Sequence, residues 1–228
     1  MSSTFLVVAG ALLMTGVMLL FNRFYKVPLH LLLICAVMLV VTGMLGGMLM
    51  YFIENGEWGN MSFFGAVLFA PPMMYLVARI IGASPSAIVD MVCPVGMVFL
   101  AVQKISCLRV GCCAGKIVGY NTLGEAVRFP SQILEGAAAL LICILLYWMV
   151  SEGVQHGRIL AWGLIIYGTA RFVLNLTRET TPFLFGLPAG NIWAIVAVLE
   201  GIVVLFLAKP KKEKGRHQKI KKRKSEIQ

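Results

Sequence analysis

Long apolar segments constrain this chain more than any other feature of its sequence. A helix needs about 20 predominantly apolar residues to cross the hydrocarbon core of a bilayer. Seven segments approach that length, at residues 5–21, 28–53, 61–82, 85–105, 130–150, 158–176 and 189–208. Only 13% of the residues are charged, about half the share found in soluble domains. The sequence therefore predicts an all-α, polytopic membrane helix bundle and excludes a soluble domain.

One membrane domain is expected over residues 1–208, with a long loop at 105–129 and a basic tail at 209–228. We interpret the first segment as a retained span, because no Lys or Arg precedes it as in a signal peptide. The tail holds half of the 20 Lys and Arg residues. A basic tail beside a final span is typical of a cytoplasmic anchor on anionic lipid. Contact with the ribosome or another protein is the alternative, and nucleic-acid binding is not expected.

The basic residues also predict the orientation. With seven spans and a cytoplasmic tail, the N-terminus lies outside, the basic loop at 22–26 lies inside and the acidic loop at 54–57 lies outside. The long loop then lies outside although it carries three cations. These are Arg109, Lys116 and Arg128. Cations on that side suggest an anionic headgroup or a phosphate.

A polar stripe runs along the sixth segment. Its members are spaced by four, four and three residues, which places them on one helix face. They are Tyr167, Arg171, Asn175 and Arg178. An Arg in an apolar helix needs a partner. The guanidinium fork suits a phosphate, and a structural ion pair with Glu135 is the alternative.

Other polar residues allow two interpretations each. Gln132 and Glu135 share one face of the fifth segment, where they could hold a headgroup or join helices. Gly111 and Gly115 could let backbone amides approach an anion, or simply form turns. Asp90, at the start of the fourth segment, is expected to be a capping or packing residue.

The six cysteines include Cys107, Cys112 and Cys113 in or near the long loop. This segment could in principle bind a metal. However, no pair has the spacing of a zinc motif and no His lies nearby, so no metal site is expected. A disulfide between Cys107 and one of the adjacent pair is permissible outside the membrane.

Several short motifs occur in a characteristic order between residues 43 and 201. They are Met-Ser-Phe-Phe-Gly at 61–65, the segment 103–115, Pro-Ser-Gln-Ile-Leu-Glu at 130–135, Tyr-Gly-Thr-Ala-Arg-Phe at 167–172 with the later Arg178, and Leu-Pro-Ala-Gly-Asn at 187–191. In this order they resemble the prolipoprotein diacylglyceryl transferase family. The resemblance implies a seven-span bacterial cell-membrane enzyme with its N-terminus outside.

The resemblance also implies a chemistry. The lipobox cysteine thiol of a secreted precursor attacks the glyceryl carbon of phosphatidylglycerol, and glycerol-1-phosphate leaves. By resemblance, Arg171 takes the phosphate with help from Arg178 and Tyr167, and Lys104 stands at a signature arginine. No cofactor is implied. The further candidates for binding the lipid, phosphatidylglycerol or another anionic phospholipid, are Gln132, Glu135, Arg109, Gly111, Gly115 and Asn175.

Some signature positions differ from the family pattern. Phe64 stands where the family has a histidine, so that candidate base is absent, and Cys107 replaces an asparagine. Two alternatives therefore remain: an enzyme of the same fold that uses another acceptor or phospholipid, and a non-catalytic lipid-binding paralogue. A transporter would predict an internal repeat, which the sequence does not show.

Overall fold

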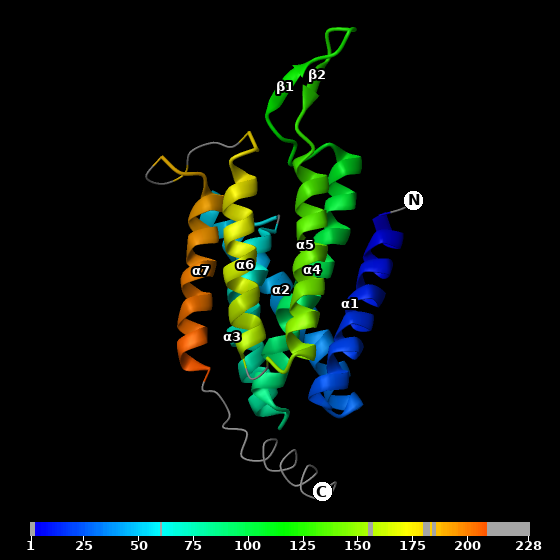
Figure 1. Ribbon diagram of the computed structural model, residues 1–228, viewed down its shortest axis with the longest axis vertical. Coiled ribbons are helices and arrows are strands. Elements are labelled where there is room, and N and C mark those ends of the chain that lie inside the picture. The colour runs from blue at the N-terminus through cyan, green and yellow to red at the C-terminus, as the bar shows by residue number, and fades with distance from the viewer. Residues whose placement is uncertain (1–2, 60, 155–156, 180–182, 184–185, 209–228) are drawn as a thin grey trace, which may run out of the picture.

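The computed structural model describes residues 3–59, 61–154, 157–179, 183 and 186–208. The expected basic tail at 209–228 lies outside the described residues. Those residues form seven helices and one two-stranded hairpin (Figure 1). The elements are α1 (Ser3–Tyr25), α2 (Leu29–Asn55), α3 (Phe63–Ile80), α4 (Pro85–Val110), β1 (Ile117–Tyr120), β2 (Ala126–Arg128), α5 (Ser131–Ser151), α6 (Arg158–Asn175) and α7 (Ala189–Leu207).

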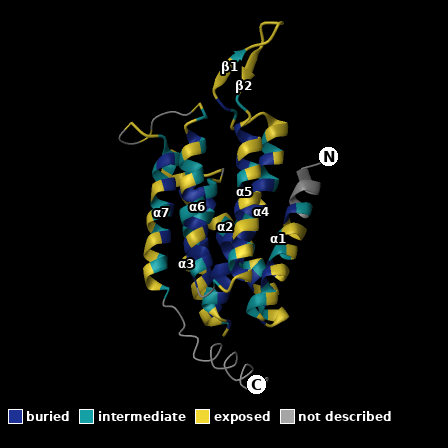
Figure 2. Ribbon diagram, in the orientation of Figure 1, coloured by how far each residue is buried: buried dark blue, intermediate teal, exposed yellow. Residues whose placement is uncertain are grey.

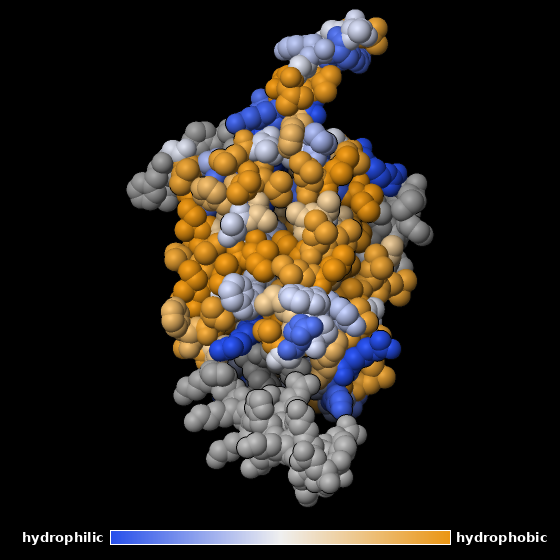
Figure 3. Space-filling view, viewed as in Figure 1, coloured by the Kyte–Doolittle hydropathy of each residue, from blue (hydrophilic) through white to orange (hydrophobic). Residues whose placement is uncertain are grey.

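Five of these helices, α2, α3, α4, α5 and α7, are long and apolar enough to cross a membrane. Arg158 and Arg171 make α6 less apolar, and the apolar part of α1 is described only over Ala9–Tyr25. Apolar residues cover the middle of the bundle, and hydrophilic residues gather towards its two ends (Figure 3). The predicted class, an all-α multi-pass membrane bundle, is confirmed.

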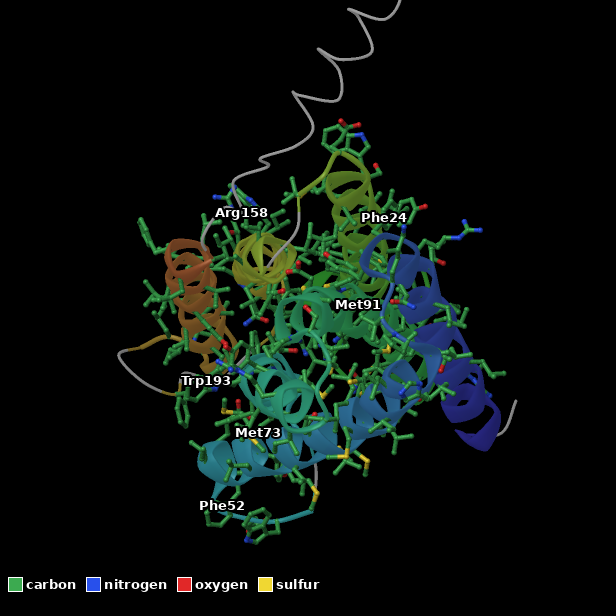
Figure 4. All side chains as sticks on the ribbon, turned by 90° about the horizontal axis from the view of Figure 1, so that it is seen from below. Phe24, Phe52, Met73, Met91, Arg158 and Trp193 are labelled. Atoms are coloured by element: carbon green, nitrogen blue, oxygen red, sulfur yellow. The ribbon has the colours of Figure 1, made fainter. Side chains whose placement is uncertain are left out.

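The helices run side by side, and the hairpin projects from one end of the bundle (Figure 1). The helix α1 begins at the hairpin end, and α7 ends at the opposite end. Every helix contains residues that are buried in the bundle (Figure 2). The most enclosed span is α4. In its apolar 18-residue stretch 72% of the residues are buried, against 22–33% in the corresponding stretches of α2, α3, α5 and α7. Met91 of α4 lies at the centre of the bundle and Phe52 at its rim (Figure 4).

Glycines allow close approach between neighbouring helices. A Cβ atom on Gly65 of α3 would collide with the carbonyl group of Gly46 of α2. A Cβ atom on Gly168 of α6 would lie 2.7 Å from the carbonyl oxygen of Ala194 in α7. Small residues at such crossings are typical of helices in membranes, where close backbone packing drives association.

Asp90 is fully buried and joins three helices. Its Oδ1 accepts a hydrogen bond from the N–H of Leu160 in the first turn of α6 (3.2 Å), and its Oδ2 accepts one from the hydroxyl of Tyr25 in α1 (2.9 Å). First-turn amides have no partner within their own helix. The expected capping and packing role of Asp90 is confirmed.

The outer loop is shorter than predicted. The helix α4 continues through Val110, so the first six residues of the expected 105–129 loop are helical. Gly111 ends the helix in a left-handed conformation (φ 73°), and its N–H bonds to the carbonyl oxygen of Cys107. The antiparallel hairpin of β1 and β2 forms most of the remainder.

Candidate functional site

A buried carboxylate lies at the centre of three cations near the hairpin end of the bundle. Glu135 of α5 forms ion pairs with Lys104 of α4, with Arg171 of α6 and with Arg178, which follows α6. The Nη1 atom of Arg178 lies 3.2 Å from Oε1 of Glu135. The side chain of Glu135 is 3% exposed, and those of its three partners are 8–14% exposed. We call these four residues the cation cluster.

Local structure explains how the four side chains meet. Pro130 precedes α5, so Glu135 lies one turn inside that helix. Lys104 lies on the part of α4 that packs against α5, because a Cβ atom on Gly136 would lie 3.5 Å from the Cβ of Lys104. Arg171 lies in the last turn of α6, and the chain then turns so that Arg178 reaches the same carboxylate. The predicted alternative for Arg171, a pair with Glu135, is therefore formed.

The cation cluster has more positive than negative charge. Three cations surround one carboxylate, and Glu135 is the only carboxylate paired with them in the described parts of the chain. The Nε atoms of Arg171 and Arg178 are buried and have no hydrogen-bond acceptor among the described residues. Buried charges and donors are costly unless they are paired. The cluster can therefore accept an anion with several oxygen atoms.

An aromatic wall borders the cation cluster on the side of the bundle core. The guanidinium carbon of Arg171 lies 5.8 Å from the ring centroid of Phe64 of α3, which is a cation–π distance. Tyr167 of α6 packs 6.1 Å from Phe64 and edge-on to Phe63 at 5.8 Å, between ring centroids. Phe64 is thus part of the site, at the position where the resemblance implies a histidine.

Gln132 and Gly115 form the outer rim of the cluster. The Nε2 atom of Gln132, one turn before Glu135, donates to the carbonyl oxygen of Cys112 (2.9 Å). Gly115 pairs with Arg178 as an isolated antiparallel bridge, and a Cβ atom there would collide with the carbonyl of Phe129. Both residues therefore position the loop between α4 and β1, which pairs with Arg178.

Three other predicted residues have different structural settings. Arg109 is exposed in the last turn of α4, and Gly111 serves as the cap of that helix. Asn175 donates from Nδ2 to Oδ1 of the buried Asn191 at the start of α7 (2.8 Å). A Cβ atom on Gly190 would collide with Asn175, so a glycine is needed at that position.

A cavity that the sequence did not predict adjoins the cluster. It measures about 380 Å³ and is lined almost entirely by apolar side chains of α1, α2, α3, α4 and α6. Tyr167 lines this cavity and also the small pocket that contains Glu135 and Arg171. Its other walls include Gly43, Gly96 and Leu164. Apolar positions that line a cavity have the same sequence pattern as positions that face lipid, so no signal could have identified it.

The positive charge of the cluster extends to the loop after α4. A hydrogen bond from the thiol of Cys107 lowers the pKa of Cys113 below its ordinary value, and the charges of Arg178 and Lys104 act in the same direction. The thiol of Cys113 is therefore more easily ionised than an ordinary thiol. Sequence reasoning treated this residue as a disulfide candidate and, less favoured, as a metal ligand.

Comparison with known proteins identifies a family and several relatives to which this chain is similar. A sequence model of the prolipoprotein diacylglyceryl transferase family matches residues 4–207. The phosphatidylglycerol–prolipoprotein diacylglyceryl transferase of Bordetella avium is 31% identical over 161 residues, which are 65% of this chain and 61% of that protein. The Methylobacillus flagellatus protein of the same name is 30% identical over 164 residues, 66% of this chain and 62% of its own length.

A second prolipoprotein diacylglyceryl transferase of Clostridium perfringens is 23% identical over 193 residues, 75% of each chain. The match covers 61% of the Bordetella protein and 62% of the Methylobacillus protein, so this chain spans somewhat less than two thirds of the length of each. The family match covers nearly all of the described helices. This chain belongs to the prolipoprotein diacylglyceryl transferase family.

Proposed function

We propose that this protein transfers the diacylglyceryl group of phosphatidylglycerol to the lipobox cysteine thiol of secreted precursor proteins. One observation carries the proposal: the buried cation cluster, with its excess positive charge, adjoins a large apolar cavity at Tyr167. A phospholipid has the same two parts, an anionic phosphate beside apolar chains. The names of the relatives give phosphatidylglycerol as the lipid and a prolipoprotein as the acceptor.

The phosphate binds at Arg171 and Arg178. Their buried Nε atoms can donate to phosphate oxygens, and a guanidinium can contact a phosphate through two parallel hydrogen bonds. Lys104 adds a positive charge at the other carboxylate oxygen of Glu135. Cations held in place before the reaction stabilise the negative charge that grows on the leaving phosphate.

The acyl chains enter the apolar cavity. Its volume of about 380 Å³ lies within the range of small-molecule sites, and the rest of each acyl chain stays in the bilayer.

In this arrangement the hairpin end of the bundle faces outward, the N-terminus lies outside and the C-terminus is cytoplasmic. The membrane is the inner membrane of a bacterial cell, and the basic tail contacts its anionic inner surface.

The reaction is a displacement at carbon. The precursor's thiolate forms a carbon–sulfur bond to the glyceryl carbon, the carbon–oxygen bond breaks and its electron pair leaves with glycerol-1-phosphate. Arg171, Arg178 and Lys104 neutralise that leaving group, while Gln132 and Gly115 hold the loop between α4 and β1 in place. The thiol must first lose its proton, and Phe64 cannot accept a proton where the resemblance implies a histidine.

Phe64 also favours a second candidate function. Its ring packs against Tyr167 and Arg171, so a chain with this site could bind an anionic phospholipid without transferring it, or use another acceptor. Such a protein would keep the cation cluster and the cavity but would not modify a lipobox cysteine.

The test uses the full chain in vesicles of radiolabelled phosphatidylglycerol with a lipobox peptide. We expect label on the peptide, and Arg171→Ala should lower the rate by on the order of 100-fold, as removal of one charge-stabilising donor does elsewhere. Arg79→Ala is the matched control, because Arg79 is exposed at the end of α3 and contacts only Tyr75 on its own helix in the interactions described. Lipid binding without labelled peptide would support the second candidate and refute the first.

A further inference from the structure

Three cysteine thiols converge at the hairpin end of α4. Cys107 lies in the last turn of the helix, and Cys112 and Cys113 follow its end. Their sulfur atoms all lie within 4.8 Å of one another, and none of them forms a disulfide. The fold therefore brings all three thiols into one cluster.

The backbone turns sharply to bring the thiols together. Gly111 reverses the chain, and the N–H of Cys112 reaches back to the carbonyl oxygen of Cys107 (3.2 Å). Cys113 has φ 59°, a left-handed conformation that costs a residue with a Cβ atom about 1–2 kcal/mol. A non-glycine residue held in such a conformation is often functional, and here the conformation directs a thiol towards two others.

The arrangement suits a soft metal ion better than a disulfide. Zinc–sulfur bonds of about 2.3 Å in a tetrahedral site place the sulfur atoms about 3.8 Å apart. The three thiols therefore need to move together by about 1 Å at most. A disulfide needs a sulfur–sulfur distance of about 2.05 Å, and it would join two of the thiols and leave the third unused.

The thiols lie against the cation cluster. Gln132, on the same helix as Glu135, donates a hydrogen bond to the carbonyl oxygen of Cys112. Two residues after Cys113, Gly115 pairs with Arg178. These two contacts place the thiols next to the site where the leaving phosphate binds under the proposed function.

We propose that Cys107, Cys112 and Cys113 bind a zinc ion whose fourth position takes the thiol of the acceptor cysteine. This inference rests on the proposed function and deepens it, because it supplies the thiol activation that Phe64 cannot. It also departs from the sequence-based expectation of no metal. No fourth His, Cys, Asp or Glu joins the group among the described residues, and an open position is typical of catalytic rather than structural zinc.

The chemistry balances without a redox partner. A thiol that coordinates zinc loses its proton, which passes to water. The bound thiolate attacks the glyceryl carbon, and the electron pair of the broken carbon–oxygen bond leaves on the phosphate. The product is a thioether, a weaker ligand than a thiolate, so it can leave the metal. Three thiolates and Zn²⁺ carry one net negative charge, which the excess positive charge of the cation cluster offsets.

The experiment measures metal binding on the full chain, purified with reduced thiols through a tag that contains no histidine. We expect on the order of one zinc ion per chain. Cobalt(II) in its place should give the thiolate-to-cobalt charge-transfer absorption. Loss of a ligand should weaken binding more than loss of a supporting group does, so Cys113→Ser should reduce affinity by more than roughly tenfold. Cys143→Ala is the matched control, because Cys143 lies in the middle of α5.

A lipobox peptide added to the cobalt-loaded protein should change the absorption, because a fourth sulfur enters the coordination sphere, whereas a Cys→Ser peptide should not. Absence of bound metal, a native disulfide at Cys107 or an unchanged spectrum would overturn the inference. Transfer that persists after complete removal of zinc would also overturn it and would leave the proposed function standing. A peptide-dependent spectrum in a protein that transfers no lipid would support the metal site and refute the proposed function.

Discussion

Replacing Glu135 with glutamine tests the electrostatic reasoning most directly. The substitution keeps the size of the side chain and one hydrogen-bond acceptor but removes the negative charge that Lys104, Arg171 and Arg178 share. Three cations, one buried and two largely buried, would then lie together without the carboxylate that pairs with them.

The expected cost follows from burial. Removing one partner of a buried ion pair destabilises a protein by about 3–5 kcal/mol, because the remaining charge stays buried without compensation. In chains of this size each kcal/mol shifts Tm by about 2–4 °C. We therefore expect Glu135→Gln to lower Tm in detergent by roughly 6–20 °C.

Glu179→Gln is the matched control. Glu179 pairs with Arg128 at 2.6 Å, but the two side chains are 64% and 43% exposed, and exposed pairs contribute less than about 1 kcal/mol. The measurement is thermal unfolding of the wild type and both variants in the same detergent. Equal shifts for the two variants would refute the idea that Glu135 compensates the buried cations. A ligand that binds the folded state stabilises it. Phosphatidylglycerol should therefore raise the Tm of Glu135→Gln more than that of the wild type, because its phosphate can pair with the cations that the variant leaves without a carboxylate.

Three other predictions follow from packing and hydrogen bonding. Gly65→Val should destabilise the protein by about 1–3 kcal/mol through overpacking at the α2–α3 crossing, whereas Gly16→Ala, with open space around it, should have little effect on Tm. Gly96→Phe should fill part of the apolar cavity and weaken phosphatidylglycerol binding by about tenfold in a vesicle titration, while inorganic phosphate binding stays unchanged. Tyr25→Phe removes one hydrogen bond to Asp90 and should cost about 1 kcal/mol in thermal unfolding; a negligible loss would mean that Asp90 needs only its contact with Leu160.

The sequence alone determined the class of fold and most of the candidate residues. Hydrocarbon requires long apolar helices, so hydropathy located the helices within a few residues. Ionisable side chains are costly in apolar spans and therefore rare there. For this reason Arg171, Glu135 and Lys104 could be selected before their contacts were known. The end of α4 was misplaced, because Ser106, Arg109 and the neighbouring cysteines look like a loop although the helix continues to Val110.

Only the tertiary structure decided which of these residues meet. Helix periodicity placed Arg171 and Asn175 on one face, but it could not show that one pairs with Glu135 and the other with Asn191. The cavity and the thiol cluster likewise depend on contacts between segments far apart or on a sharp reversal of the chain. Apolar periodicity records which side of a helix avoids water, and in a membrane both the lipid and the protein core satisfy that requirement. The positions of the partners are therefore set by packing, which no local pattern in the sequence records.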